Sequence, residues 1–274
     1  MTEVPLSDTT QAAPISPLEG YFTQVLAVAD AEAVKLRHDP MDLVSRAVQP
    51  VLWLVLFGQV MAHVRGLATS NGASYIEFLA PGVLAQSVLF VAIFYGLSAI
   101  WERDLGVLHR YMVSPAPRSA LVIGKAIASS VRGISQSLVV YICAALLGVR
   151  LSFAPLHILG VVGLIVLASA LFSTFSLVIA CIVKTRERFM GIGQFLTMPI
   201  FFASNAIYPI SIMPDWLKLI SRVNPLSYEV DGLRALMLSQ GASSFGLGLD
   251  FGVLFLATAA FVVLATLMYP RLTQ

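Results

Sequence analysis

The chain has 274 residues, of which 58% are apolar and only 12% are charged, and its formal net charge is +2. Because an ordinary soluble domain has about 25% charged residues, this composition indicates a membrane protein with several spans. The small net charge and the lack of a basic face disfavour nucleic-acid binding. Cys143 and Cys181 both lie in apolar runs, so the sequence predicts neither a disulfide framework nor a metal site.

The first two segments are polar or amphipathic. Residues 1–20 contain three prolines and lack the basic stretch and apolar core of a secretory signal, so we predict a disordered cytosolic tail. In residues 21–42, apolar positions recur at helical spacing, which predicts an amphipathic helix on the cytosolic side. This helix could lie on the membrane surface or dock on the protein itself, and the two alternatives are compatible.

Six apolar runs follow, and each is close to the roughly 20 residues that a bilayer core requires. They cover residues 43–61, 78–100, 126–149, 156–183, 189–207 and 251–269. The sequence therefore predicts an all-α integral membrane protein with six transmembrane helices, formed by residues 43–274.

A charged loop, residues 101–125, separates the second and third runs. Its six Glu, Asp, Arg and Lys residues cannot lie in hydrocarbon, so the loop must face water, where a soluble partner could push on it. Eleven Lys and Arg residues lie in this loop and the other segments on the same side, and five lie on the opposite side. The excess of positive charge predicts that the loop and both termini are cytoplasmic. We expect the chain to lie in the plasma membrane.

Residues 208–250 form a long, half-apolar segment on the predicted outer side. Short amphipathic helices begin at Pro214 and at Asn224, and neither is long enough to span. We expect a re-entrant helical hairpin with Glu229, Asp231 and Arg234 towards water or a pore. The alternative is a pair of helices lying flat on the outer leaflet.

The chain carries no recognisable catalytic motif. The histidines lack the spacing of a metalloprotease, and Gly124–Lys125 lacks the other residues of a phosphate loop. The span interiors contain uncharged polar residues but no Asp or Glu, whereas ion-coupled carriers usually keep a carboxylate there. A secondary carrier or channel is thus the weaker alternative, and a membrane scaffold is a third.

Several segments together resemble the membrane subunit of a type 2 ABC exporter, a permease family that includes daunorubicin-type drug exporters and polysaccharide or glycolipid exporters. The segments are Leu36–Pro40, Leu56–Gly58, Phe78–Gly82, Glu102–Gly106, Ser114–Pro115, Gly124–Lys125, Met213–Leu217 and Asn224–Arg234. The resemblance implies a half-transporter that pairs with a second copy or a related permease. Two separate ATP-binding subunits would hold ATP and Mg, so the chain itself would be no enzyme and would bind no cofactor.

The resemblance also implies functional residues. Contact with the ATP-binding subunits is expected at Arg37, Asp39, Glu102, Arg103, Asp104, Gly106, Arg110, Ser114 and Pro115. An outer gate is expected at Asp215, Trp216, Asn224, Pro225, Glu229 and Arg234. Glu102 is expected in the first turn of a cytosolic helix, where the helix dipole would favour its negative charge.

The polar and aromatic residues of the spans are candidates for a translocation path for a hydrophobic drug, lipid or lipid-linked glycan. The set is Gln86, Phe94, Arg132, Gln136, Gln194 and Asn205. Arg132 shares a helical face with Ser129, Gly133 and Gln136, which predicts that it points to a cytosolic vestibule, with snorkelling to the headgroups as the alternative. The aromatic residues could equally pack between helices or face lipid.

Overall fold

The structure, a computed structural model, describes residues 48–62, 74–106, 117–183 and 185–273 and the single helical positions 23, 30 and 34. The predicted tail and nearly all of the predicted amphipathic helix lie outside these residues. Throughout the described ranges the regular elements are helices, and one isolated β-bridge joins Leu151 to Leu238.

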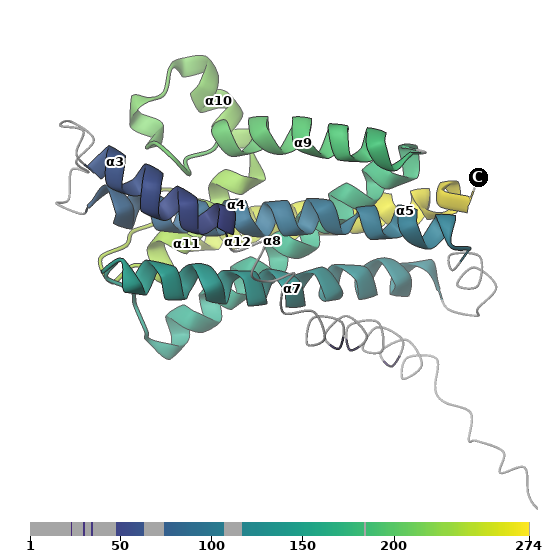
Figure 1. The fold of residues 1–274 in the computed structure, drawn as a ribbon, viewed down its shortest axis with the longest axis horizontal. Coiled ribbons are helices and arrows are strands. Elements are labelled where there is room, and N and C mark those ends of the chain that lie inside the picture. Colours follow the sequence, from purple (N-terminus) through teal and green to yellow (C-terminus); the bar gives the residue numbers. More distant parts are fainter. Residues whose placement is uncertain are drawn as a thin grey trace, which may run out of the picture.

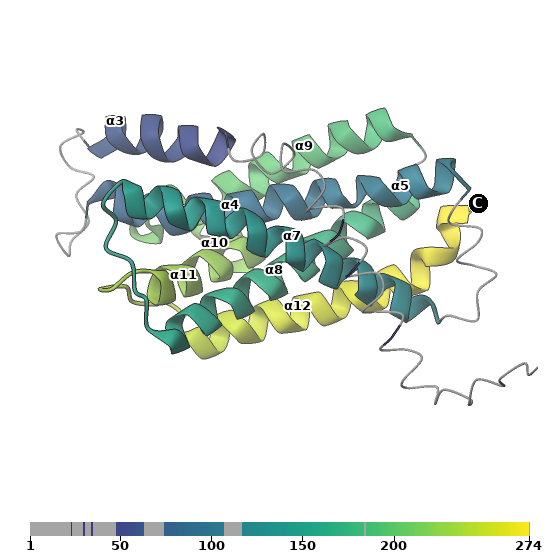
Figure 2. The same cartoon turned by 60° about the horizontal axis from the view of Figure 1, so that its bottom comes forward.

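The helices lie side by side along the long axis of a single bundle (Figure 1; Figure 2). In chain order they are η1 (Trp53–Phe57, a π-helix), α3 (Gly58–Ala62), α4 (Tyr75–Tyr95), α5 (Leu97–Asp104), α7 (Arg118–Leu146), α8 (Pro155–Ile182), α9 (Arg186–Phe202), η2 (Ile210–Ile212), α10 (Asp215–Val223), α11 (Pro225–Met237), α12 (Leu247–Met268) and η3 (Tyr269–Thr273). The C-terminal helix η3 lies at the same end of the bundle as the end of α5 (Figure 1).

Four helical stretches in the described residues are long and apolar enough to cross a membrane: Tyr75–Asp104, Arg118–Leu146, Pro155–Ile182 and Leu247–Leu272. They correspond to the second, third, fourth and sixth predicted spans. The fifth predicted span is α9, which has 17 residues. The first is a shorter apolar helix over Val48–Met61, because residues 43–47 lie outside the described ranges.

Helix α4 lies at the centre of the bundle. It begins with a capping box in which the Ser74 hydroxyl accepts the Glu77 N–H at 3.3 Å and the Glu77 carboxylate accepts the Ser74 N–H at 3.0 Å. Glu77 also pairs with Arg150 at 2.8 Å, which raises the pKa of the guanidinium by hydrogen bonding and charge attraction. This pair ties the start of α4 to the loop between α7 and α8.

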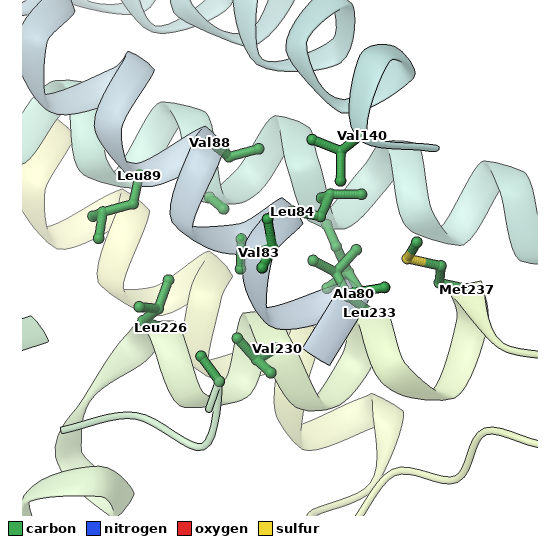
Figure 3. Close-up of a cluster of buried hydrophobic side chains, with 14 of the residues drawn as sticks. Ala80, Val83, Leu84, Val88, Leu89, Val140, Leu226, Val230, Leu233 and Met237 are labelled. Atoms are coloured by element: carbon green, nitrogen blue, oxygen red, sulfur yellow. The ribbon is translucent and has the colours of Figure 1, made fainter. Parts of the chain in front are cut away.

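Nearly every side chain of α4 is buried, because other helices surround it. Figure 3 shows Val83, Leu84 and Val88 of α4 near Val140 of α7, with Val230 and further side chains of α11 close by. Lipid is as apolar as these side chains, so close van der Waals packing, rather than exclusion of water, distinguishes the folded bundle from separated helices.

A second cluster of buried side chains lies at the end of the bundle that holds the C-terminus. It joins α5, α7, α8, α9 and η3 through Ile100, Val122, Cys181, Phe189, Tyr269 and Leu272. The cluster adjoins the charged loop, so α5 and α7, the helices on either side of the loop, are packed together at that end of the bundle.

The segment between α9 and α12 contains the two predicted short helices. α11 packs against α4, α8 and α12, whereas α10 keeps Trp216, Leu219 and Val223 largely exposed. The expectation that Glu229 and Asp231 face water or a pore is wrong for the single chain, since both are fully buried. The reason is that helices and the loop after α11 enclose α11 on several sides, whereas its amphipathic pattern suggested a single buried face.

Candidate functional site

A cavity of about 270 Å³ opens between the first apolar helix, α4 and α7. Its lining brings together three of the six residues that the sequence predicts for a translocation path: Gln86, Phe94 and Gln136. The complete lining is Gln49, Pro50, Gln86, Ser87, Phe90, Val91, Phe94 and Gln136. Gln49 and Pro50 lie about one helical turn before the π-helix η1, and such helical irregularities often occur at functional sites.

Apolar side chains provide most of the exposed surface of the cavity lining, and its polar groups are uncharged. The rings of Phe90 and Phe94 stack with their centroids 6.0 Å apart. The Ser87 hydroxyl already donates to the Val83 carbonyl at 2.7 Å, so its proton is engaged. Gln86 is 3% exposed, and its Nε2 has no hydrogen-bond partner among the described residues. A buried, unpaired donor costs about 1–3 kcal/mol, so a guest that offers an acceptor oxygen to Gln86 would gain affinity.

Arg132 lies one turn before Gln136 on α7 and is partly buried. Its guanidinium lies 5.2 Å from the centroid of the Tyr95 ring, at the end of α4. The face that it shares with Ser129 and Gly133 is buried, and Gly133 approaches Ser169 of α8 closely. Arg132 thus lies on a helix that lines the cavity, one turn from the lining residue Gln136, and its orientation towards a vestibule stays a prediction.

The other two predicted path residues lie elsewhere. Gln194 is exposed on α9, and Asn205 is buried in the turn that follows α9, where its backbone carbonyl accepts from Arg234 at 3.0 Å. In the single chain, therefore, neither joins the cavity.

At the opposite end from α10, Glu102 forms an ion pair with Lys125. Both carboxylate oxygens accept from the Lys125 ammonium, at 2.8 and 2.7 Å, and Lys125 is 8% exposed. The expectation that Glu102 lies near a helix N-terminus is wrong, because α5 begins at Leu97 and Glu102 is in its last turn. There the helix dipole disfavours a carboxylate, so Lys125 supplies the stabilising charge.

A second polar contact connects α5 to α9. Asp104 pairs with Arg103 at 3.2 Å and with Arg186 at 2.9 Å, and the Arg186 guanidinium lies 3.9 Å from the centroid of the Trp101 ring. Sequence reasoning assigned no role to Lys125 as a partner of Glu102, nor to Trp101 and Arg186. Their only signal was a position at the boundary between a charged loop and an apolar run.

The remaining residues predicted to contact a partner subunit are only partly described. Gly106 follows the end of α5 with φ +70°, in the left-handed region, and a side chain there would meet open space. Arg37, Asp39, Arg110, Ser114 and Pro115 lie outside the described residues.

The predicted outer gate divides into an exposed and a buried part. Asp215 and Trp216 are exposed on α10, where Asp215 pairs with Lys218 at 3.0 Å. A groove of about 730 Å³ runs between α9 and α10 and is lined by both helices and by Asn224 and Pro225. This groove is almost entirely apolar, as is expected of a surface that contacts lipid or another apolar helix.

Asn224 and Pro225 start α11 and fasten it to α9. The Asn224 side chain caps α11 by accepting the Leu226 N–H at 3.0 Å, and it donates to the Ile200 carbonyl at 2.6 Å. Further along α11, Glu229 is fully buried with no partner for its carboxylate oxygens among the described residues, and Arg234 lies 4.1 Å from the centroid of the Phe78 ring. These residues join the hairpin to α9 and α4.

Metal binding has no support from the described residues, where no three His, Cys, Asp or Glu side chains lie close enough to hold an ion. The geometry is that of a helical bundle with an uncharged cavity and a charged end.

Comparison with known proteins gives the family. The family model for the ABC-2 type transporter matches residues 23–238. Relatives include ycf38 of Cyanophora paradoxa, 29% identical over 204 residues that cover 74% of this chain and 70% of that protein. The daunorubicin resistance ABC transporter permease protein DrrB1 of Streptomyces coeruleorubidus is 23% identical over 236 residues, with coverages of 86% and 81%. The inner membrane transport permease YadH of Escherichia coli K12 is 25% identical over 238 residues, with coverages of 84% and 87%. The matched region includes the cavity helices, the charged loop and the α10–α11 hairpin, and the chain belongs to the ABC-2 type transporter family of membrane permeases.

Proposed function

We propose that this ABC transporter membrane subunit is an export permease that moves a hydrophobic drug, a lipid or a lipid-linked glycan out of the cytoplasm. The observation that carries the proposal is the cavity between the first apolar helix, α4 and α7. Its stacked Phe90 and Phe94 rings suit an apolar cargo, and the unpaired amide of Gln86 suits an acceptor oxygen on that cargo. A secondary carrier or channel that needs no ATP is the alternative.

The full transporter is proposed to contain two six-span halves, this chain and a second copy or a related permease. Support comes from α9, the fifth predicted span, where Gln194 and Phe195 are exposed side by side in the single chain. An amide at membrane depth is unfavourable against lipid but acceptable against another protein chain or a water-filled path. The same reasoning keeps Gln194 as a candidate path residue in the assembled transporter.

Energy is proposed to come from a separate ATP-binding subunit that holds ATP and Mg on the cytosolic side. The charged loop between α5 and α7 would transmit the motion of that subunit to the permease. The ion pairs Glu102–Lys125 and Asp104–Arg186 support this route, since they connect the end of α5 to α7 and α9. Because α5 continues from α4 after Gly96, motion at the loop can reach two helices that line the cavity.

A transport assay tests the proposal. The permease and an ATP-binding subunit are reconstituted in vesicles, and ATP-dependent movement of daunorubicin, a fluorescent phospholipid and a lipid-linked sugar is measured. Export that requires ATP and disappears with a hydrolysis-deficient partner subunit supports the proposal. Transport that follows an ion gradient without ATP would favour the secondary carrier.

Gln86→Leu is expected to lower the rate of ATP-dependent export about two- to tenfold, because one hydrogen bond to the cargo contributes about 0.5–1.5 kcal/mol. Gln240→Leu, on an exposed turn, is the matched control and should leave export unchanged. Equal export by the two variants would remove Gln86 from the path. The measurement is the initial export rate at limiting cargo, normalised to the amount of inserted protein.

The proposed topology places both termini in the cytoplasm. In a chain whose own cysteines are replaced, Ala242→Cys, in the exposed loop before α12, should react with an impermeant thiol reagent added to intact cells. Ser7→Cys and Thr273→Cys should react only after the membrane is permeabilised, because the Lys and Arg distribution holds these ends inside. Labelling of the terminal positions in intact cells would reverse the orientation.

A further inference from the structure

Helix α11 packs against α12 (Figure 2). At the start of α12, two buried carboxyl groups meet at one serine hydroxyl. Asp231 of α11 and Asp250 in the first turn of α12 are both fully buried. Ser243, in the loop between these helices, has its Oγ 2.8 Å from Oδ2 of Asp231 and 3.0 Å from Oδ2 of Asp250. We call these three residues the Ser243 bridge. The proposed transport function makes no use of it.

The Ser243 bridge needs one more proton than the Ser243 hydroxyl can supply. A serine hydroxyl has one proton to donate and two lone pairs that accept. The Gly246 N–H donates to Ser243 Oγ at 2.6 Å, so one lone pair is used. One proton and one lone pair remain for two carboxyl groups. Ionised carboxylates only accept, so if both were ionised, one of them would face a lone pair at hydrogen-bond distance. A single proton shared between two buried carboxylates would not offset their mutual repulsion, so one carboxyl group holds a proton.

The other contacts locate that proton. Oδ2 of Asp231 also accepts the N–H groups of Ser244 and Phe245, at 2.7 and 2.9 Å, so several donors already converge on it. Arg234, three residues further along α11, interacts favourably with the negative charge of Asp231. Asp231 is thus the ionised partner. We infer that Asp250 is a neutral carboxylic acid that donates to Ser243, which donates to Asp231, so that a bound proton holds α11 and α12 together.

The surrounding charges agree with a neutral Asp250. Asp250 is the only titratable residue of α12, and the negative charge of Asp231 opposes a second charge there. The N-terminal end of α12 favours negative charge, but full burial removes the water that would solvate it. The other ionisable groups of α11 are Tyr228, whose ring lies 4.9 Å from that of Phe245, Glu229, which is buried without a partner among the described residues, and Arg234. In α8, His157 has its Nδ1 2.8 Å from Ser152 Oγ, and in α4 Glu77 pairs with Arg150. Helix α7 carries Tyr141 and Cys143 in this half. Its cations Arg118, Lys125 and Arg132 lie further along the bundle, where Lys125 contacts α5 and Arg132 contacts α4.

The bridge is consequently a pH-sensitive latch. Loss of the Asp250 proton places two negative charges on either side of Ser243, and no cation among the described residues is placed to neutralise Asp250. The bridge then opens and frees the first turn of α12 from α11. The bridge exists only in the folded chain and only while this proton is bound, so the stability from the bridge is present at acidic pH and is lost as the pH rises.

Thermal unfolding of the purified full chain, measured from about pH 5 to about pH 9, tests the latch. In the native chain the melting temperature should fall as the pH rises. Asp250→Asn should keep the acidic-pH melting temperature and lose this pH dependence, because the amide N–H donates to Ser243 as the carboxylic acid does. Asp231→Asn should lower the melting temperature at every pH, because it removes a charged acceptor. Asp215→Asn, at an exposed acid on α10, is the matched control and should change neither quantity.

Infrared spectroscopy of the folded chain provides a second readout that does not depend on stability. The C=O stretching band of a protonated carboxylic acid should be present at neutral pH and should diminish in Asp250→Asn. Glu229→Gln identifies any contribution from Glu229 to the same band. The inference is overturned if Asp250→Asn leaves the band unchanged, or if the two Asn variants at positions 231 and 250 are destabilised equally. Neither experiment involves transport, so its failure would leave the proposed export function standing.

Discussion

Glu102→Ala is expected to leave insertion and assembly near normal but to uncouple ATP hydrolysis from export. Glu102 and Lys125 connect the end of α5 to α7 across the charged loop, with N–O distances of 2.8 and 2.7 Å. Breaking a fully buried pair costs about 3–5 kcal/mol. The Glu102 side chain is 24% exposed, so solvent screening reduces that cost, and the bundle should still fold. What is lost is the rigid connection between the loop and the cavity helices.

The decisive measurement is the number of cargo molecules exported per ATP hydrolysed in the same vesicles. The double variant Glu102→Lys with Lys125→Glu should recover most of the coupling if the direct ion pair is what transmits the motion. Glu187→Ala, at an exposed acid in the first turn of α9, serves as the control and should export normally. Native export per ATP in Glu102→Ala would rule out the coupling role.

Gly82→Ala should destabilise the bundle, because α4 and the turn after α9 touch at that residue. A Cβ on Gly82 would collide with the backbone carbonyl of Ala206, and backbone cannot rotate away as a side chain can. Overpacking of this kind typically costs about 1–3 kcal/mol. The shift would also strain the neighbouring Asn205, whose carbonyl accepts from Arg234. We expect a lower melting temperature and less folded protein in the membrane.

Gly191→Ala is the matched control for Gly82→Ala. Gly191 lies within α9, where an added Cβ would meet open space in the single chain. The same substitution there should be neutral or stabilising, since Ala favours a helix over Gly by up to about 1 kcal/mol. Destabilisation of the two variants to the same extent would show that the close contact at Gly82 contributes little. A large effect at Gly191 alone would instead indicate that a second chain packs closely there.

The sequence by itself determined the class of the molecule. The lengths of the apolar runs predicted the four helices that are long enough to span. The bilayer core holds no water to pair with backbone N–H and C=O groups, and a helix pairs these groups within itself. The start of α11 at Asn224–Pro225 was also predictable, since the cap and the first turn are local structure. Ordered motifs then gave the permease family, which the family model confirms. Orientation and the number of spans in the assembled transporter remain predictions.

Tertiary structure alone decided which side chains meet. Glu102 and Lys125 are 23 residues apart, and Asp104 and Arg186 are 82 apart, so no local periodicity could pair them. The position of Glu102 in a helix was mispredicted because the apolar run ends at Ile100, whereas the helix itself continues to Asp104. Gln86, Phe94 and Gln136 meet in one cavity, while Gln194 and Asn205 do not, because packing of whole helices sets those distances.

The buried carboxyl groups illustrate the same limit. An amphipathic pattern records only which face of α11 is apolar, and it assigned Asp231 to water. The loop before α12 instead folds over that face, and its N–H groups and Ser243 replace the water that the carboxylate would otherwise need. A sequence pattern indicates which residues of a helix are polar. Whether water or another segment provides the hydrogen-bond partners of those residues depends on how the chain packs.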